Sequence, residues 1–407
     1  MTRVLEPATP GQVGLSPDGL ARVDAAVQAQ IDKGVVAGAI TLVARHGKLV
    51  HASTLGVKDL ASGEPLQVDS LFRIFSMTKP ITGTAMMILH DAGLWSPEDP
   101  IAKHLPELAG MKVLAGFDAA GQPVLEQAAR APTMGELMTH RAGFAYGIQG
   151  STPEDKLYYD AGLWSAADLN EFVQRLATVP LVYQPGSTWR YSLAMDLQGA
   201  IIERLSGQSL PDFMQARIFG PLGMVDTAFH TPPEKRERRA TLYFGAEGAA
   251  LMPLAANPLL PDHDTVPSLA LGGAGLISTA PDYARYAQML LNGGEFAGKR
   301  IVSEVSVKAQ MTNYLPDELL ERRIVAGHQK FRPGFGYGYN GVVFTDPALA
   351  GIPVGKGTYH WDGAAGTWFW VDPENDLLFV GLIQLLSYTA PPLQATTQKL
   401  MADAILD

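Results

Sequence analysis

The sequence predicts an α+β fold, in which an antiparallel sheet is built from both ends of the chain, is flanked by helices and is interrupted by a mostly helical inserted domain. Three observations predict it. Strand-like segments occur near both ends of the chain, and helical periodicity with Pro- and Gly-rich loops dominates between them. Strands from both ends can share one sheet. We expect residues 1–94 and 268–407 to form the sheet domain and residues 95–267 to form the insertion.

The first elements follow from local patterns. Residues 18–33 predict a helix, because apolar side chains recur at helical spacing and Gly34 follows as a cap. Residues 37–44 and 49–57 are rich in β-formers and are separated by a short turn at His46-Gly47-Lys48, which predicts an antiparallel hairpin.

The later elements are predicted in the same way. Residues 78–92 and 280–292 show helical patterns, and the second of these is preceded by Thr279 as a cap. Strands are expected at residues 337–344, 358–360, 367–371 and 377–385, with a closing helix at 393–405.

Composition excludes several classes of function. The 407 residues include no cysteine, so disulfides and thiolate chemistry are absent. The 31 Lys and Arg against 41 Asp and Glu give a net charge of -10, which would repel nucleic acid. No stretch reaches the roughly 18 apolar residues of a membrane helix, and the first residues lack an export signal. We therefore expect a soluble, cytoplasmic protein without nucleic-acid or membrane partners.

The first candidate for chemistry is Ser76-Met77-Thr78-Lys79, at the start of a predicted helix. A spacing of three puts the hydroxyl and the ammonium on one face of the first turn. A lysine in a dry cleft can have its pKa lowered enough to take the proton of the serine. The alternative is an ordinary helix start with a surface lysine. Because the apolar segment 71–75 precedes Ser76, we favour a buried edge.

Two further motifs could complete a site. Tyr191-Ser192-Leu193 follows a Pro-Gly turn, and a phenol near cations could relay protons. Residues 359–366 end a late strand with Gly363 and Ala364, where a backbone N–H could help to bind an oxyanion. The alternatives are an aromatic plug for the first motif and a strand bend with a core tryptophan for the second.

Together and in this order, these motifs resemble the serine β-lactamase and penicillin-binding-protein superfamily, and most closely the family VIII carboxylesterases, which are related to class C β-lactamases. The resemblance implies a β-lactamase-like fold with Ser76 as the acylated nucleophile and Lys79 and Tyr191 as the proton-handling pair. It further implies backbone donors and substrate contacts, namely the N–H groups of Ser76 and Ala364 as the oxyanion hole and Phe75, Trp361 and Gly363 as substrate-binding residues. His140 stays outside the catalytic set.

Two departures bear on the substrate. The tyrosine motif has Leu193 where β-lactamases have Asn, and the late strand has Trp361 where they have Lys. The missing lysine removes a charge that would meet the carboxylate of a β-lactam. Both changes favour neutral esters over anionic lactams.

We therefore expect a carboxylesterase that cleaves short-chain esters through an acyl-Ser76 intermediate, with acyl transfer to an alcohol as a second outcome. The alternatives are a β-lactamase or D-alanyl-D-alanine peptidase, and a non-catalytic binding protein on the same fold. No cofactor and no metal are expected, since residues 262–264 (Asp-His-Asp) lie in a predicted loop and the G-x-G-x-x-G match at 336–341 leads into a strand. A small-molecule ester is the expected partner, and the oligomeric state is open.

Overall fold

The protein is represented by a computed structural model that describes residues 5–148, 150, 152–246, 248–254, 263–320, 325–326, 329–330, 333–387 and 391–406. A central sheet of eight strands has the order β1–β3–β2–β18–β17–β16–β15–β14. These strands are β1 (Glu6–Pro7), β2 (Gly38–Arg45), β3 (Lys48–Gly56), β14 (Phe335–Tyr337), β15 (Val342–Phe344), β16 (Tyr359–Gly363), β17 (Thr367–Asp372) and β18 (Leu377–Leu382).

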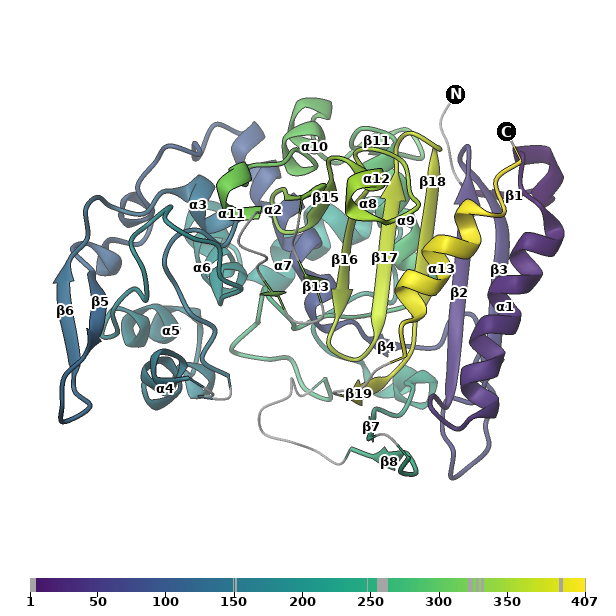
Figure 1. The fold of residues 1–407 in the computed structure, drawn as a ribbon, viewed down its shortest axis with the longest axis horizontal. Helices are drawn as coiled ribbons and strands as arrows, with labels where there is room; N and C mark the ends of the chain where they lie inside the picture. The colour runs from purple at the N-terminus through teal and green to yellow at the C-terminus, as the bar shows by residue number, and fades with distance from the viewer. Residues whose placement is uncertain are drawn as a thin grey trace.

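The two ends of the chain meet inside this sheet. β2 pairs with β18 in an antiparallel register that runs from Arg45 opposite Leu377 to Ile40 opposite Leu382. In Figure 1 the purple N-terminal strands therefore lie directly beside the yellow C-terminal strands. The prediction that both ends of the chain contribute strands to one sheet is confirmed. The sheet was expected to be antiparallel, but β1 runs parallel to β3, so the sheet is mixed.

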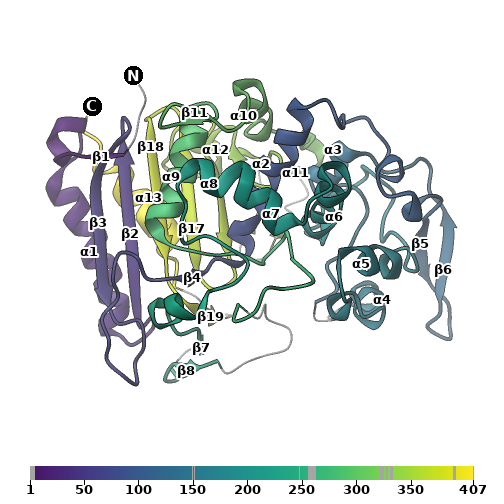
Figure 2. The ribbon, with the colours of Figure 1, turned by 180° about the vertical axis from the view of Figure 1, so that it is seen from behind.

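Helices cover both faces of the sheet. Helices α1 (Pro17–Asp32) and α13 (Leu393–Ala402) pack on one face, where Trp370 and Phe379 lie stacked at 4.3 Å between ring centroids. Helices α2 (Thr78–Asp91) and α9 (Ala280–Leu291) lie on the other face, as Figures 1 and 2 show from opposite sides. Since both faces are covered, every residue of β2 is buried, which explains its nearly continuous apolar sequence.

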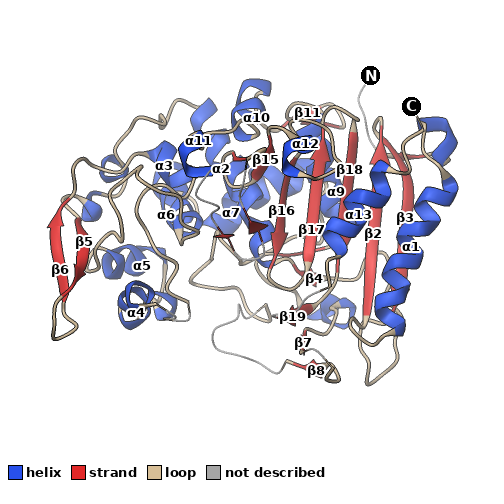
Figure 3. Ribbon diagram, viewed as in Figure 1, coloured by secondary structure: helices blue, strands red, loops and turns tan. Residues whose placement is uncertain are grey.

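The segment between α2 and α9 contains more helix than strand, and long loops join its helices, as Figure 3 shows on the side away from α1. Its helices are α3 (Met134–Met138), α4 (Pro153–Asp160), α5 (Leu169–Leu176), α6 (Ala194–Ser206), α7 (Leu210–Met214) and α8 (Gly220–Leu222), and its hairpin is formed by β5 (Lys112–Phe117) and β6 (Pro123–Gln127). The domain boundaries after residues 94 and 267 stay a prediction.

Short elements complete the described part of the chain. They are β4 (Phe72–Arg73) with β9 (Ile277–Ser278), β7 (Tyr243–Gly245) with β8 (Met252–Pro253) and β19 (Leu385–Ser387), β10 (Glu295–Phe296) with β11 (Lys299–Arg300), β12 (Val325–Ala326) with β13 (Gln329–Lys330), and helices α10 (Glu304–Gln310), α11 (Asp317–Leu320) and α12 (Pro347–Ala350). Within the described ranges, none of the helices combines the length and the apolar character needed to cross a bilayer.

Three predicted strands were wrong in extent. The single strand expected at 337–344 is a hairpin of β14 and β15, because Asn340 adopts a left-handed conformation with φ of 62° and reverses the chain. The strand expected at 377–385 ends at Leu382, and β19 then leaves the central sheet to pair with β7. Strand β16 extends to Gly363, beyond the predicted end at residue 360.

Candidate active site

Ser76 lies in a single turn of 3-10 helix, Phe75–Met77, that leads into α2. The preceding residue, Phe75, has a φ of 42°, a conformation that costs energy for a side chain of this size. Phe75 is held there by burial against Leu242 and Ala365. The strained turn sets Ser76 at the N-terminal end of α2, where the helix dipole favours negative charge.

Lys79 is one turn further along and is completely buried. Its Nζ donates to Ser76 Oγ at 3.0 Å and to the carbonyl oxygen of Gly273 at 2.7 Å. Burial lowers the pKa of Lys79 to about 7, although the negative charges of Asp196 and Asp362 act in the opposite direction. Burial thus favours the unprotonated amine, which is the form that can accept a proton.

Tyr191 comes from the insertion, just before α6, and meets Ser76 from the other side. Its Oη is 2.8 Å from Ser76 Oγ, and its ring stacks on Tyr146 at 5.2 Å between centroids. The sequence argument relied on nearby cations to favour phenolate, and Lys79 Nζ does lie 4.7 Å from the ring centroid. Burial nevertheless raises the pKa of Tyr191, so its phenol stays protonated at neutral pH and acts as a proton donor.

The end of β16 lies against the turn that carries Ser76. Thr367 Oγ1 donates to the carbonyl oxygen of Ile74 at 3.2 Å, and a Cβ on Gly363 would lie 2.3 Å from that same oxygen. Only glycine permits this close approach. Ala364 follows at the exposed turn. Among the described residues, no backbone hydrogen bond outside the regular helices and strands uses the N–H of Ser76 or of Ala364 as donor. Their role as an oxyanion hole stays a prediction.

Trp361 is buried in β16, with its ring centroid 5.8 Å from that of Tyr191. Trp361 and Tyr191 thus give the site an aromatic wall. Phe75 instead packs behind the serine turn, in the small cluster with Leu242 and Ala365. A role for Phe75, Trp361 and Gly363 in substrate binding stays a prediction.

Sequence reasoning missed Asp196, which lies in α6 with 1% of its surface exposed. Its Oδ1 accepts a hydrogen bond from the N–H of Gly273 at 2.9 Å, and the carbonyl of this same Gly273 accepts the bond from Lys79. Burial raises the pKa of Asp196, and the charge of Lys79 opposes that rise. The available signal was a charged residue among the apolar positions of the helix that follows Tyr191-Ser192-Leu193.

His140 contacts Ser192, the residue that follows Tyr191. Its Nδ1 lies 2.9 Å from Ser192 Oγ and accepts a hydrogen bond from the Ser192 N–H at 3.2 Å. Burial, with a smaller effect of the charge on Lys79, holds the pKa of His140 well below its usual range. A neutral, buried imidazole that binds the residue after Tyr191 can position that segment.

No cluster of three or more metal-ligating side chains occurs among the residues that the structure describes. Of the Asp-His-Asp segment, Asp262 lies outside the described residues, and His263 Nε2 is 3.2 Å from the carbonyl oxygen of Gly275.

The mixed sheet with its helical insertion, and a serine, lysine and tyrosine that meet beside the end of β16, define a serine-type β-lactamase fold. Residues 23–402 match the family model described as Beta-lactamase, and the chain belongs to this family.

The chain is also similar to individual proteins and to solved structures. The chain is 39% identical over 366 residues to Protein Rv1367c of Mycobacterium tuberculosis, covering 88% of each chain. It is 30% identical to Esterase EstB of Burkholderia gladioli, covering 86% of each. Among solved structures, it resembles EstCE1, described as a hydrolase with promiscuous acyltransferase activity, with a TM-score of 0.77 and 24% identity, covering 96% of this chain and 98% of that one.

Proposed function

We propose that this protein is a serine carboxylesterase that cleaves short-chain esters of small molecules through an acyl-Ser76 intermediate, with acyl transfer to an alcohol as a second outcome. One observation carries the proposal: Ser76 Oγ lies 3.0 Å from Lys79 Nζ and 2.8 Å from Tyr191 Oη. A hydroxyl between an amine of lowered pKa and a protonated phenol has both a base and an acid within reach. The relationship to EstB, an esterase, supports this substrate class.

Acylation begins when Ser76 Oγ attacks the ester carbonyl carbon and Lys79 takes the hydroxyl proton. The carbonyl oxygen becomes an oxyanion that accepts hydrogen bonds from the N–H groups of Ser76 and Ala364. When the C–O bond to the alcohol breaks, the Tyr191 phenol protonates the leaving oxygen and is reprotonated by the Lys79 ammonium. The products of this stage are the free alcohol and the acyl-serine ester.

Deacylation runs the same groups in reverse. A water molecule attacks the acyl carbonyl, and its proton passes through Tyr191 to Lys79. The second oxyanion occupies the same two N–H groups, and its collapse releases the carboxylic acid and returns the proton to Ser76 Oγ. An alcohol in place of water would give a new ester, which is acyl transfer.

The test is a paired assay on one preparation. Rates on p-nitrophenyl esters of increasing chain length are compared with rates on the β-lactam nitrocefin. We expect fast turnover of acetate and butyrate esters, slow turnover of nitrocefin, and a loss of about 10⁴-fold or more in kcat for Ser76→Ala. Ser62→Ala, in an exposed turn, is the matched control. Unchanged ester turnover in Ser76→Ala would refute the proposal, and nitrocefin turnover that rivals ester turnover would replace it with a β-lactamase.

The location of the protein in the cytoplasm stays a prediction, which cell fractionation would check.

A further inference from the structure

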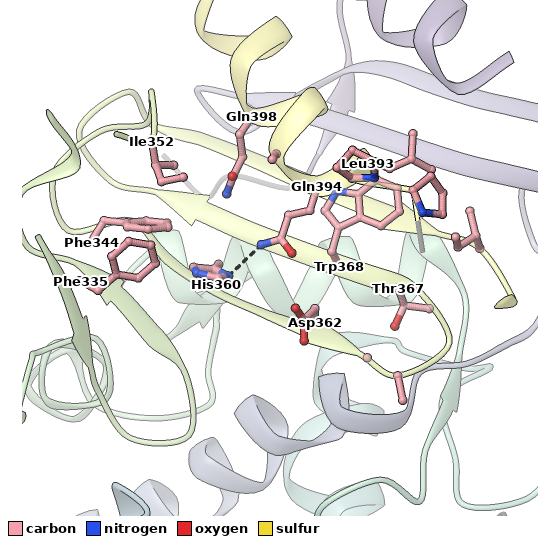
Figure 4. A pocket seen from close by; sticks show the side chains of 17 residues that line it. Phe335, Phe344, Ile352, His360, Asp362, Thr367, Trp368, Leu393, Gln394 and Gln398 are labelled. Carbon is pink, nitrogen blue, oxygen red and sulfur yellow. Dashed lines mark hydrogen bonds between the residues drawn. The ribbon is translucent and has the colours of Figure 1, made fainter. Parts of the chain in front are cut away.

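A cavity lies on the face of β16 that is turned away from Tyr191. Strand β16 ends just before Ala364, the proposed oxyanion donor. Neighbouring residues of a strand point to opposite faces of its sheet: Trp361 faces Tyr191, whereas His360 faces this cavity. The cavity has a volume of about 310 Å³ and lies between the β16–β17 hairpin and the first turn of α13 (Figure 4). Ala364, at the turn of the hairpin, also lines it.

Among the described lining residues, three buried side-chain nitrogens have no hydrogen-bond partner: His360 Nε2, Trp368 Nε1 and Gln398 Nε2. The side-chain nitrogen of Gln394 lies 3.1 Å from His360 Nδ1 (Figure 4). An amide nitrogen can only donate, so Nδ1 accepts and the neutral imidazole carries its hydrogen on Nε2. This Nε2 and the side-chain nitrogen of Gln398 are buried and have no hydrogen-bond partner among the described residues. His360 is 0% exposed and Gln398 is 3% exposed.

The rest of the lining is apolar or acidic. The ring of Phe344 stacks on His360 at 4.8 Å between centroids, and Phe335, Ile352 and Trp368 extend the apolar surface. Asp362 is the acidic side chain of the lining, and none of the described lining residues is a lysine or arginine. An anion placed here would meet a carboxylate, and none of the described lining residues carries a positive charge, so the lining favours an uncharged molecule.

We propose that this cavity is a second binding site, specific for a small, uncharged and mainly apolar molecule that carries a carbonyl oxygen. The apolar body would lie against Phe344 and Trp368, and the oxygen would accept hydrogen bonds from His360 Nε2 and Gln398 Nε2. Buried donors without partners destabilise a protein unless something satisfies them, which makes this pair a recognition feature. The volume is at the lower end of the range for small-molecule sites.

The test measures binding of 4-phenylbutan-2-one, a neutral ketone, by titration calorimetry. Two comparators are of similar size: n-butylbenzene lacks the oxygen, and 4-phenylbutanoate, whose carboxyl carbon is one atom further from the ring, carries a negative charge. For the wild-type protein we expect the ketone to bind about tenfold more tightly than either comparator. Equal or tighter binding of 4-phenylbutanoate would overturn the specificity for uncharged molecules, and equal binding of n-butylbenzene would overturn the role of the two donors.

Variants assign the binding to this cavity. Gln398→Leu and His360→Phe should each weaken binding of the ketone about tenfold, whereas Gln122→Leu, in the exposed β5–β6 turn, should leave it unchanged. Gln398→Leu should also raise the Tm of the unliganded protein, because it removes a buried donor that has no partner among the described residues. A cooperative thermal transition shows that each of the two cavity variants is folded. Absence of binding at millimolar ketone, or an unchanged Kd in Gln398→Leu, would overturn the proposal. Neither measurement depends on Ser76 or on ester turnover.

Discussion

The active site joins two regions that are held together in different ways. On the sheet side, which supplies Ser76, Lys79 and Ala364, the positions are set by strand pairing and close main-chain approach, as where β16 pairs with β17 and Gly363 meets Ile74. On the insertion side the positions depend on side-chain hydrogen bonds.

Tyr191 illustrates the insertion side. The residue after it is bound by the imidazole of His140, and Asp196 holds the N–H of Gly273. The difference suggests a division of labour. In the proposed mechanism, the sheet side would carry the nucleophile, the base and the oxyanion donors, whereas the insertion side would supply a proton donor and raise the pKa of Lys79 through the charge of Asp196. Substitutions on the two sides should therefore differ in size and in kind.

The largest expected effect within this comparison is on the sheet side, at the base. Lys79→Met should lower kcat/KM for p-nitrophenyl butyrate by about 10⁴-fold, because the serine hydroxyl loses the group that takes its proton. The variant should unfold at a Tm equal to or above that of the wild type, since a buried amine is replaced by an apolar chain. Lys299→Met, at an exposed lysine, is the control. Activity within tenfold of the wild type would remove Lys79 from the mechanism.

A smaller effect is expected on the insertion side. Tyr191→Phe removes only the hydroxyl, and we expect a loss of about 10²-fold in kcat with p-nitrophenyl butyrate. The 2,4-dinitrophenolate leaving group needs less protonation than p-nitrophenolate. With a 2,4-dinitrophenyl ester, Tyr191→Phe should therefore lower the acylation rate by a smaller factor. Tyr159→Phe, at an exposed tyrosine, controls for the substitution. An equal loss with both leaving groups would contradict a role for Tyr191 as the acid.

The smallest effect should be a shift of the pH profile. Lys79 acts as a base only when unprotonated, so kcat/KM of the wild type should rise with pH through the pKa of about 7 and then level off. Asp196 favours the ammonium form, and Asp196→Asn should therefore lower the pKa of Lys79 and move the rising limb to lower pH. The amide can still accept from Gly273, which keeps the geometry.

Asp282→Asn is the matched control for this shift, because Asp282 is also buried and accepts a hydrogen bond from a backbone N–H, that of Asp226. Its pH profile should overlay that of the wild type. A rising limb that stays in place in Asp196→Asn, or that moves equally in Asp282→Asn, would contradict the electrostatic role of Asp196.

Local sequence patterns predicted the part of this site that is formed by residues close together in the chain, Ser76 and Lys79. The spacing of Ser76 and Lys79 in one helical turn is sufficient to bring their side chains together, and the structure places them 3.0 Å apart. No local rule connects Ser76 with Tyr191, which is 115 residues away, and that pairing was inferred from the family resemblance. The fold class was predictable because strand and helix patterns are regular over whole elements.

The turn at Asn340 was missed, although the pair Asn340-Gly341 is typical of a hairpin turn and Asn340 adopts the left-handed conformation that such turns use. Two other features could not be read from the sequence. Asp196 carries no motif, and its importance arises only because Gly273 lies beside it in space. The cavity behind β16 depends on where α13 lies relative to the hairpin, which is a property of packing and not of any one segment.

The pairing of β2 with β18 also sets the order in which the protein can be completed during synthesis. Ile40 pairs with Leu382, about 340 residues later in the chain. At a synthesis rate of roughly 5–20 residues per second, β2 lacks its partner strand β18 for about 20–70 s. An apolar strand with an unpaired edge binds other strands readily. The nascent chain is therefore prone to aggregation until β18 has been synthesised. The yield of folded protein in cells should depend on chaperones that cover the unpaired edge of β2.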